Sequence, residues 1–194
     1  MLNKIILASK SKVRKDILDN NNIPNEVKPS SIDEDVVKES LIKERATPEI
    51  ISKNLAELKA NKISLNELDQ LVLGADSVID LEGELISKPQ SRKEALHILK
   101  KLNGKTHHLI SSVCISKNGE MIWNHTDKAI LTMKKFSDED LIKYLSKISD
   151  EALYAYNVYQ IEGEGKKLFY KIEGNENTIM GLPVEKIKEY LNNI

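Results

Sequence analysis

The chain has 194 residues, with 29 basic and 30 acidic side chains and a formal net charge of −1. This balance argues against a protein that grips nucleic acid through one strongly basic face, so we expect no stable nucleic-acid complex. The single cysteine, Cys114, excludes an intrachain disulfide and lies in an apolar run, which predicts a buried, unreactive thiol. No apolar run approaches the roughly 20 residues of a membrane span. The apolar start is too short for a secretory signal, so we expect a cytoplasmic protein with no membrane partner.

The first third of the chain has the pattern of short strands and helices in alternation. Residues 5–8 predict a buried strand, and Ser11 is expected to cap a helix that ends near residues 20–22. A second strand is expected over residues 23–29, followed by an acidic loop at residues 33–35. Thr47 and Pro48 are expected to begin a helix that runs to about residue 63. Its inward face is expected to carry Ile51, Leu55 and Leu58.

The centre of the chain, residues 71–79, is expected to carry the chemistry. Its ends, residues 71–73 and 78–79, are apolar and predict two strand segments around a Gly-Ala-Asp-Ser loop. Gly74 and Ala75 leave room for a ligand or a second backbone. Asp76 would then sit where a parallel strand meets its loop, the place at which α/β proteins bind ligands. The alternative is an aspartate that only caps a turn.

The second half adds a β-rich region. Residues 91–94 resemble a capping box ahead of a helix, and Gly104 is expected to end that helix in the left-handed conformation. Long strands over residues 109–116 and 121–133 are predicted to form a hairpin at Asn118-Gly119. The remaining expected elements are a helix from Ser137 with Leu141, Ile142, Leu145 and Ile148 inward, strands at 158–161 and 168–172, and a last helix at 184–191. The mixture predicts one α/β domain over residues 1–194, with two lobes and a mixed, twisted sheet flanked by helices.

Three groups of charged or polar residues are candidates for a phosphate site. Ser9, Ser11 and Arg14 lie at a strand-to-helix junction, where free N–H groups favour anions; an ordinary cap beside a solvated basic face is the alternative. Acids on separate loops can share Mg²⁺ with substrate phosphates, although each of the first three, taken alone, fits a surface loop better. These acids are Asp33, Glu34, Asp35 and Asp76.

Lysines supply the remaining positive charge. Lys59 and Lys88, with Arg14, would give three cations suited to a polyphosphate, while each lysine alone is more often solvated. The Gly104-Lys-Thr106 segment is not a phosphate-binding P-loop, because Leu99 stands where that motif has glycine. The histidines and Cys114 have no zinc-site spacing.

Taken together, these segments resemble the Maf family of nucleotide pyrophosphatases over nearly the whole chain. Residues 7–18 are similar to the family's opening LASxSxxRxxLL, 32–34 to its VDE, 55–60 to LAxxKA, and 73–78 to LGADT or LGADQ. Residues 87–89 resemble xKP, residues 102–104 with His107 resemble LSGxxH, and 179–183 resemble xxGLP. The order and spacing of the fragments make the resemblance specific.

The resemblance implies a fold like that of the inosine triphosphate pyrophosphatases, with the site in a cleft between lobes. It implies a homodimer that hydrolyses nucleoside triphosphates to monophosphate and pyrophosphate with Mg²⁺ or Mn²⁺. Carried over by position, it places in the site Ser9, Arg14, Glu34, Lys59, Asp76 and Lys88. Two departures put the substrate base in question: Glu162 stands where many members have glutamine, and Ser77 follows Asp76 in place of threonine or glutamine.

On this hypothesis Glu34 and Asp76 hold the metal, and Asp76 also orients or deprotonates the attacking water. Arg14, Lys59 and Lys88 hold the triphosphate, while Ser77 and Glu162 contact the substrate. Two alternatives stay open for Glu162: a further metal ligand beside Glu34 and Asp76, or a solvated acid next to a glycine turn. The rival hypothesis is a non-catalytic regulator of cell division that binds a nucleotide or a protein partner. A pure binder has no need of carboxylates and lysines in one cleft.

Overall fold

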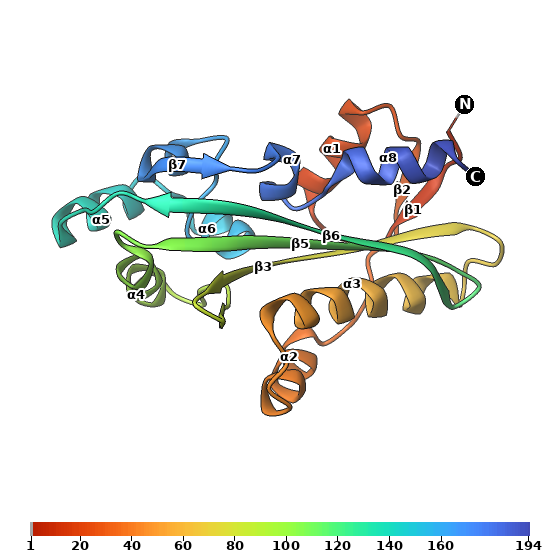
Figure 1. Ribbon diagram of the computed structural model, residues 1–194, viewed down its shortest axis with the longest axis horizontal. Coiled ribbons are helices and arrows are strands. Elements are labelled where there is room, and N and C mark those ends of the chain that lie inside the picture. Colours follow the sequence, from red (N-terminus) through yellow and green to blue (C-terminus); the bar gives the residue numbers. More distant parts are fainter. Residues whose placement is uncertain (1) are drawn as a thin grey trace.

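The computed structural model describes residues 2–194, with the backbone alone for residues 154–156 (Figure 1). In this part of the chain seven strands form one sheet, in the order β2-β1-β3-β5-β6-β7, and β4 also pairs with β3. The strands are β1 Ile5–Leu7, β2 Asn25–Val27, β3 Leu71–Leu81, β4 Glu84–Ile86, β5 Thr106–Lys117, β6 Glu120–Met133 and β7 Phe169–Glu173.

The helices begin largely where side-chain caps were expected. The side chains of Ser11, Thr47, Ser91 and Ser137 each accept a hydrogen bond from a backbone N–H three residues on, which satisfies one of the unpaired N–H donors of the first turn. The helices are α1 Lys12–Asn20, α2 Glu34–Lys43, α3 Pro48–Ser64, α4 Arg92–Leu102, α5 Asp138–Leu145, α6 Asp150–Tyr156, α7 Glu176–Ile179 and α8 Val184–Asn192, with a 3₁₀ turn at Glu164–Leu168. The expected α/β class with a mixed sheet is confirmed. None of these helices, within residues 2–194, is long and apolar enough to span a bilayer.

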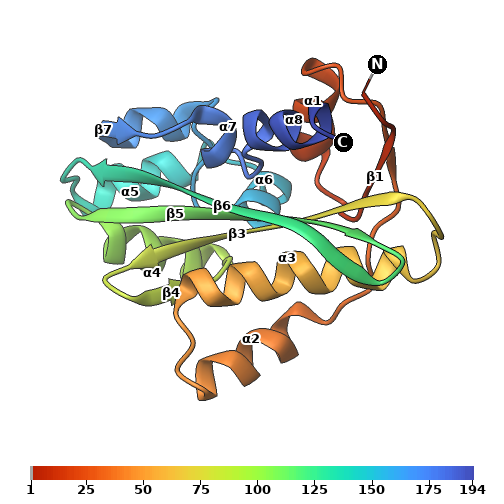
Figure 2. The same cartoon turned by 45° about the vertical axis from the view of Figure 1, so that its right-hand side comes forward.

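Helices cover both faces of the sheet (Figures 1 and 2). Alternate residues of β3 divide between the two faces, as the period of a strand requires. Leu73 and Ala75 join a cluster with buried residues of α1 and α8. Val72 joins a second cluster with α3 and with Cys114, whose thiol is 1% exposed. The expected burial of Cys114 is confirmed, and burial raises its pKa to about 11, which disfavours the reactive thiolate.

β3 is one uninterrupted strand, and the expected loop at residues 74–77 is wrong. Asp76 and Ser77 pair with Ser112 and Ser111 of β5 in regular antiparallel register. Gly74 makes room for the backbone of α3 and does not form a turn. A Cβ at this position would lie 2.0 Å from the carbonyl oxygen of Ala56 in α3. The glycine therefore lets α3 approach the sheet closely, which the sequence alone could not distinguish from room for a ligand.

The other edge of β3 is covered by two different strands. β1 runs parallel to β3 and its register ends at Leu7 opposite Leu73, while β4 is antiparallel and begins at Ile86 opposite Ile79. Between these pairs, at residues 74–78 of β3, no described strand lies alongside. The sheet thus has an internal gap on this edge.

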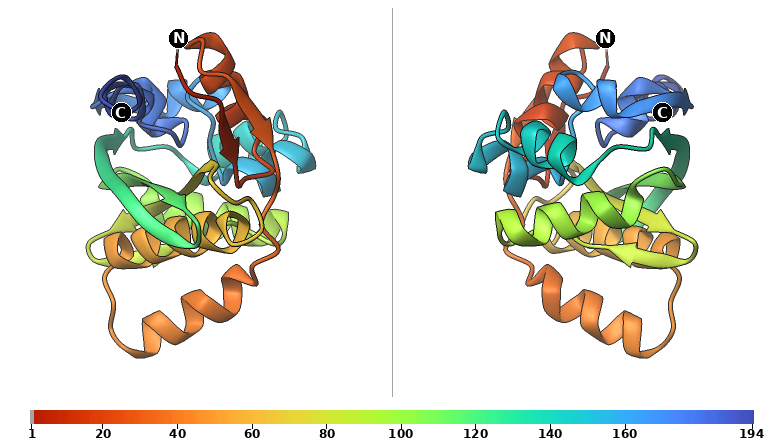
Figure 3. Two further views of the ribbon diagram at one scale, coloured as in Figure 1. Left: turned by 90° about the vertical axis from the view of Figure 1, so that its right-hand side faces the viewer. Right: turned by 90° about the vertical axis from the view of Figure 1, so that its left-hand side faces the viewer.

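Four further expectations need correction. Residues 33–35 are not a loop: Asp33 caps α2, a helix with no buried residue that lies apart from the sheet beyond α3 (Figure 3). Residues 158–161 form no strand, although three of them are buried in the core. Leu58 and Ile142 are exposed, because Lys59 and Tyr144 take the inward positions beside them. The elements β4, α6 and α7 were not expected at all.

Candidate active site

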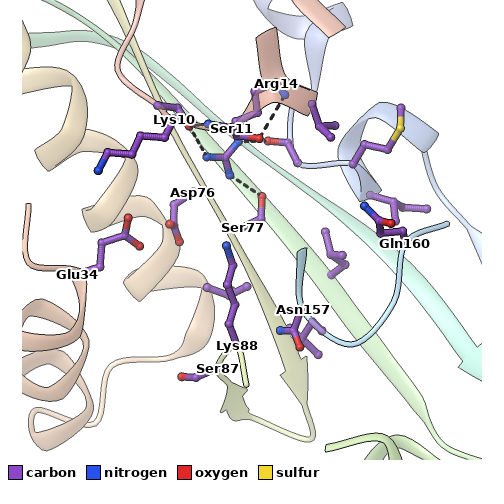
Figure 4. A pocket seen from close by; sticks show the side chains of 18 of the residues that line it. Lys10, Ser11, Arg14, Glu34, Asp76, Ser77, Ser87, Lys88, Asn157 and Gln160 are labelled. Atoms are coloured by element: carbon purple, nitrogen blue, oxygen red, sulfur yellow. Dashed lines mark hydrogen bonds between the residues drawn. The ribbon is translucent and has the colours of Figure 1, made fainter. Parts of the chain in front are cut away.

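The gap on the β3 edge opens into a cleft of about 600 Å³ (Figure 4). Such a volume suits a small-molecule ligand. Its wall is built from the loop after β1, the first turns of α1 and α2, the Lys59 side chain of α3, the middle of β3, and the segments after β4, α6 and α7. All of the expected site residues line it: Ser9, Ser11, Arg14, Glu34, Lys59, Asp76, Ser77, Lys88 and Glu162. The structure brings these residues together, and their individual roles stay predictions.

Asp76 and Lys59 form the most deeply buried ion pair of the cleft. The Lys59 Nζ lies 2.8 Å from Asp76 Oδ1 and also 2.8 Å from Glu34 Oε1, so one ammonium group bridges two carboxylates. Lys59 is 6% exposed and Asp76 is 5% exposed. Burial raises the pKa of Glu34, but Lys59 and Lys38 lower it more, and its pKa ends below the ordinary value. Glu34 is therefore a carboxylate at neutral pH.

The second carboxylate oxygen of Asp76 fits a metal ion. Oδ2 is buried and accepts no hydrogen bond from any described residue, an arrangement that costs free energy unless a cation or water completes it. Figure 4 shows Asp76, Glu34 and the Lys88 ammonium group turned toward the same space. No group of three histidine, cysteine or acidic side chains able to hold a metal occurs in the described chain. One or two carboxylates plus phosphates is the usual Mg²⁺ arrangement, so Asp76 and Glu34 fit this ion.

Arg14 binds mainly to the protein itself. Its guanidinium donates to Gly181 O at 2.9 Å, to Ala75 O at 2.9 Å, to Ser9 Oγ at 3.2 Å and to Ser77 Oγ at 3.1 Å. Burial lowers the pKa of Arg14, and Asp76 and Glu34 oppose the shift. Four of the five N–H donors of a guanidinium are thus used to join α1, β3 and the loop after α7. Arg14 was expected only to bind phosphate. Its hydrogen bonds show that it also fixes the shape of the cleft.

Ser77 continues this network into the protein interior. Its hydroxyl lies 2.8 Å from Ser111 Oγ, and Ser111 in turn donates to the Thr178 carbonyl oxygen at 2.8 Å. Ser111 has one hydroxyl proton, so Ser77 must donate to Ser111 while it accepts from Arg14. The Thr178 hydroxyl donates to Asp127 at 2.6 Å. Ser77 is therefore held by protein partners on both sides.

Lys88 supplies a cation from the far side of the cleft, two residues after β4. Burial and the positive charge of Arg14 lower its pKa, while Glu34 and Asp76 act in the opposite direction. A bound phosphate would favour its charged form. Its position suits contact with the phosphates of a ligand.

The three remaining expected residues differ in how firmly they are held. Ser9 Oγ accepts from the Ser11 N–H at 3.2 Å, and Ser11 Oγ accepts from the Arg14 N–H at 3.3 Å, so the loop is ordered by its own serines. Glu162 is exposed at the mouth of the cleft and forms no hydrogen bond or ion pair with a described residue. Among the early acids only Glu34 lines the cleft, since Asp33 accepts from the Val36 N–H as a cap.

Sequence reasoning missed Ser52 and the Ser111 network. The Ser52 hydroxyl is buried and donates to the Asp76 carbonyl oxygen at 3.2 Å. Ser52 precedes Lys59 by seven residues, two turns of α3, so the helical period could have placed both on the face that meets β3. Ser111 and Thr178 come from distant segments, and no local pattern indicates that they meet.

Comparison with known proteins decides the family. The model of the Maf-like protein family matches residues 4–194. The chain belongs to the Maf family. A relative from Pelagibacter ubique, named nucleoside triphosphate pyrophosphatase, is 71% identical over 98% of both chains. A Maf relative from Rhizobium etli, named 7-methyl-GTP pyrophosphatase, is 36% identical over 95% of this chain and 92% of its own.

A solved structure supports the fold assignment. A HAM1 protein from Coxiella burnetii aligns with all of this Maf chain and with all of its own, with a TM-score of 0.52 and 11% sequence identity. At this identity the likeness concerns the fold alone. The expected similarity to the inosine triphosphate pyrophosphatase architecture is confirmed at that level.

Proposed function

We propose that this Maf protein is a nucleoside triphosphate pyrophosphatase, which hydrolyses its substrate to the nucleoside monophosphate and pyrophosphate. The observation that carries the proposal is the buried Asp76 carboxylate, with one unpartnered oxygen, beside a cleft that Lys59, Lys88 and Arg14 also line. Relatives that match almost the whole chain bear this activity as their name. Modified triphosphates are included, because two relatives are named 7-methyl-GTP pyrophosphatase.

The chain's own residues suit attack of water on the α-phosphorus. Asp76 would orient that water or accept its proton through Oδ2, the oxygen that has no protein partner. Lys88 and Lys59 would neutralise charge on the triphosphate and on the departing pyrophosphate. Arg14 would hold Ser9 and the Gly181 backbone in place around the phosphates. Positioning and charge neutralisation then supply most of the catalysis.

A divalent cation, Mg²⁺ or Mn²⁺, is part of the proposal. Asp76 and Glu34 would hold it, and Asp76 Oδ2 is the oxygen left available for it. When bound, the ion would neutralise phosphate oxygens and polarise the phosphorus toward attack.

The test is a measurement of products with the purified chain. Incubation with Mg²⁺ and a panel of pyrimidine, purine and 7-methylated triphosphates should release pyrophosphate and monophosphate in equal amounts. Release of inorganic phosphate instead, or no release from any member of the panel, would contradict the proposal. The second result would favour the rival hypothesis of a non-catalytic regulator of cell division.

Substrate choice, assembly and location complete the proposal. Glu162 and Ser77 would contact the substrate, and Glu162→Gln should change the ranking of bases if Glu162 reads the base. A homodimer in the cytoplasm is expected from the family resemblance. Light scattering during gel filtration measures the assembly, with a mass near twice 22.0 kDa expected.

A further inference from the structure

Lys59 lies in the position that a cation between Glu34 and Asp76 would take. Its Nζ is 2.8 Å from one oxygen of each carboxylate, and its side chain is 7% exposed. The lysine is fixed there by α3, which Gly74 allows to lie directly against β3. In this structure the two candidate metal ligands already share one positive charge.

We propose that Lys59 is a placeholder cation, which makes binding of the divalent metal depend on the nucleotide. The inference rests on the proposed function and adds an order to it: the metal enters with the triphosphate and not before it. While Lys59 remains between the carboxylates, a bare metal ion that binds Asp76 Oδ2 meets an ammonium group bound to the other oxygen of the same carboxylate. The ion binds favourably when it arrives already coordinated by phosphate oxygens, since Mg²⁺ commonly takes much of its coordination from substrate.

The charge of the cleft supports the same order. The described residues that line it carry six basic and four acidic side chains, an excess of two positive charges. The basic ones are Lys10, Lys12, Arg14, Lys38, Lys59 and Lys88. A bare divalent cation would double that excess, whereas a triphosphate of about four negative charges with its metal carries about two and would balance it. By this count the charge of the metal–nucleotide complex suits the cleft better than the charge of the metal alone.

The first experiment measures Mn²⁺ binding directly, by electron paramagnetic resonance of the free ion. For the wild-type protein we expect Mn²⁺ alone to bind at least about tenfold more weakly than Mn²⁺ with an α,β-imido triphosphate, an analogue that is not hydrolysed at the α-phosphorus. The Mn²⁺ that the analogue binds without protein is measured separately and subtracted. Equal affinity with and without the analogue would overturn the proposal. This comparison needs no variant, so it does not depend on whether a substituted protein folds.

The second experiment removes the placeholder. Lys59→Met should tighten the binding of Mn²⁺ alone by at least about tenfold, because the two carboxylates lose their internal counter-ion. Lys53→Met is the matched control, since Lys53 lies on the same helix, pairs with Glu49 and is outside the cleft, and it should leave Mn²⁺ affinity unchanged. Addition of Asp76→Asn to Lys59→Met should abolish the gain. Unchanged or weaker Mn²⁺ binding by folded Lys59→Met would overturn the placeholder role.

Failure of this inference can be told from failure of the proposed function. Pyrophosphate release by the wild-type protein with Mg²⁺ tests the reaction alone. An active wild-type enzyme that binds Mn²⁺ equally well with and without the analogue would retain the proposed function and refute the placeholder.

Discussion

Asp76 and Arg14 at the cleft each bond to more than one part of the protein. Asp76 accepts from Lys59 through its side chain and from Ser52 through its carbonyl oxygen. Arg14 makes four hydrogen bonds to three segments of the chain. Conservative substitutions at these positions therefore separate charge from shape.

Asp76→Asn keeps the size of the side chain and removes its charge. We expect kcat for pyrophosphate release to fall by at least roughly a hundredfold, because the carboxylate is the proposed base or metal ligand. Circular dichroism should show a folded protein. Asp80→Asn, on the same strand but outside the cleft, is the control and should keep its activity. Near-normal kcat in folded Asp76→Asn would remove Asp76 from the mechanism.

Arg14→Lys keeps the charge and loses the planar fork of donors. An ammonium group cannot reproduce hydrogen bonds to Gly181, Ala75, Ser9 and Ser77 together. We expect unfolding in urea to show a loss on the order of 2–4 kcal/mol, with kcat/KM lowered at least about tenfold. Lys15→Arg, on the exposed side of α1, should change neither quantity. Wild-type stability in Arg14→Lys would show that the network has little structural role.

Among the elements, those with local signals could be predicted from sequence. Caps at Ser11, Thr47, Ser91 and Ser137 act within one turn, and Asn118-Gly119 adopts positive φ at both positions, as a tight hairpin requires. Asp33 caps α2 in the same way, but the acids at the start of this helix were interpreted as a loop. The helix buries no residue, so its sequence lacks the apolar repeat that would have indicated a helix. Residues 158–161 show the opposite error, since a short apolar run does not distinguish a strand from a buried irregular segment.

The contact between α3 and β3 could not be predicted from the sequence. It depends on Gly74 having no side chain, and nothing local to Gly74 indicates that α3 packs there. In Gly74→Ala the new methyl group would meet Ala56 O at 2.0 Å and the Ala60 N at 2.7 Å. We expect α3 to move outward, with a loss of stability of about 1–3 kcal/mol. Lys59 moves with α3, so kcat should fall as well. Ala75→Gly is the control for backbone flexibility; if it lowered kcat as much as Gly74→Ala, helix approach would not be the cause.

On the scale of the whole molecule, the sequence predicted the fold class and the set of residues that share the cleft. It did not predict how the cleft forms, because the gap between β1 and β4 depends on strand order and register. The family resemblance supplied the composition of the site, and the structure supplied the roles of Ser52 and Arg14 in shaping it. A second polar pair, His107 with Tyr159, is buried behind the wall of the cleft that Tyr159 helps to form, with Nε2 and the phenol oxygen 2.8 Å apart.

Acid stability of the whole protein should depend on His107. Burial lowers its pKa to about 4, against 6.5 for the unfolded chain, so the folded state holds the neutral ring. Between these values the unfolded chain binds the proton more readily, and stability falls as the pH drops from 6.5 toward 4, by roughly 3 kcal/mol in total. In urea titrations His107→Gln should lose less stability over this interval than the wild-type protein.

His97→Gln is the control for the histidine prediction, because His97 is exposed on α4. It should follow the wild-type pH profile. If His107→Gln and His97→Gln both matched the wild-type profile, another group would govern the acid response.

The uninterrupted course of β3 also limits how the protein can move. The strand passes from the β1 side of the gap to the β4 side and is paired with β5 along its length. Closure of the cleft around a ligand must therefore bend two paired strands, since no hinge loop crosses the gap on β3. Bending paired strands is costly, so the two sides of the cleft should approach only slightly, and the distance between its walls is set before a ligand binds.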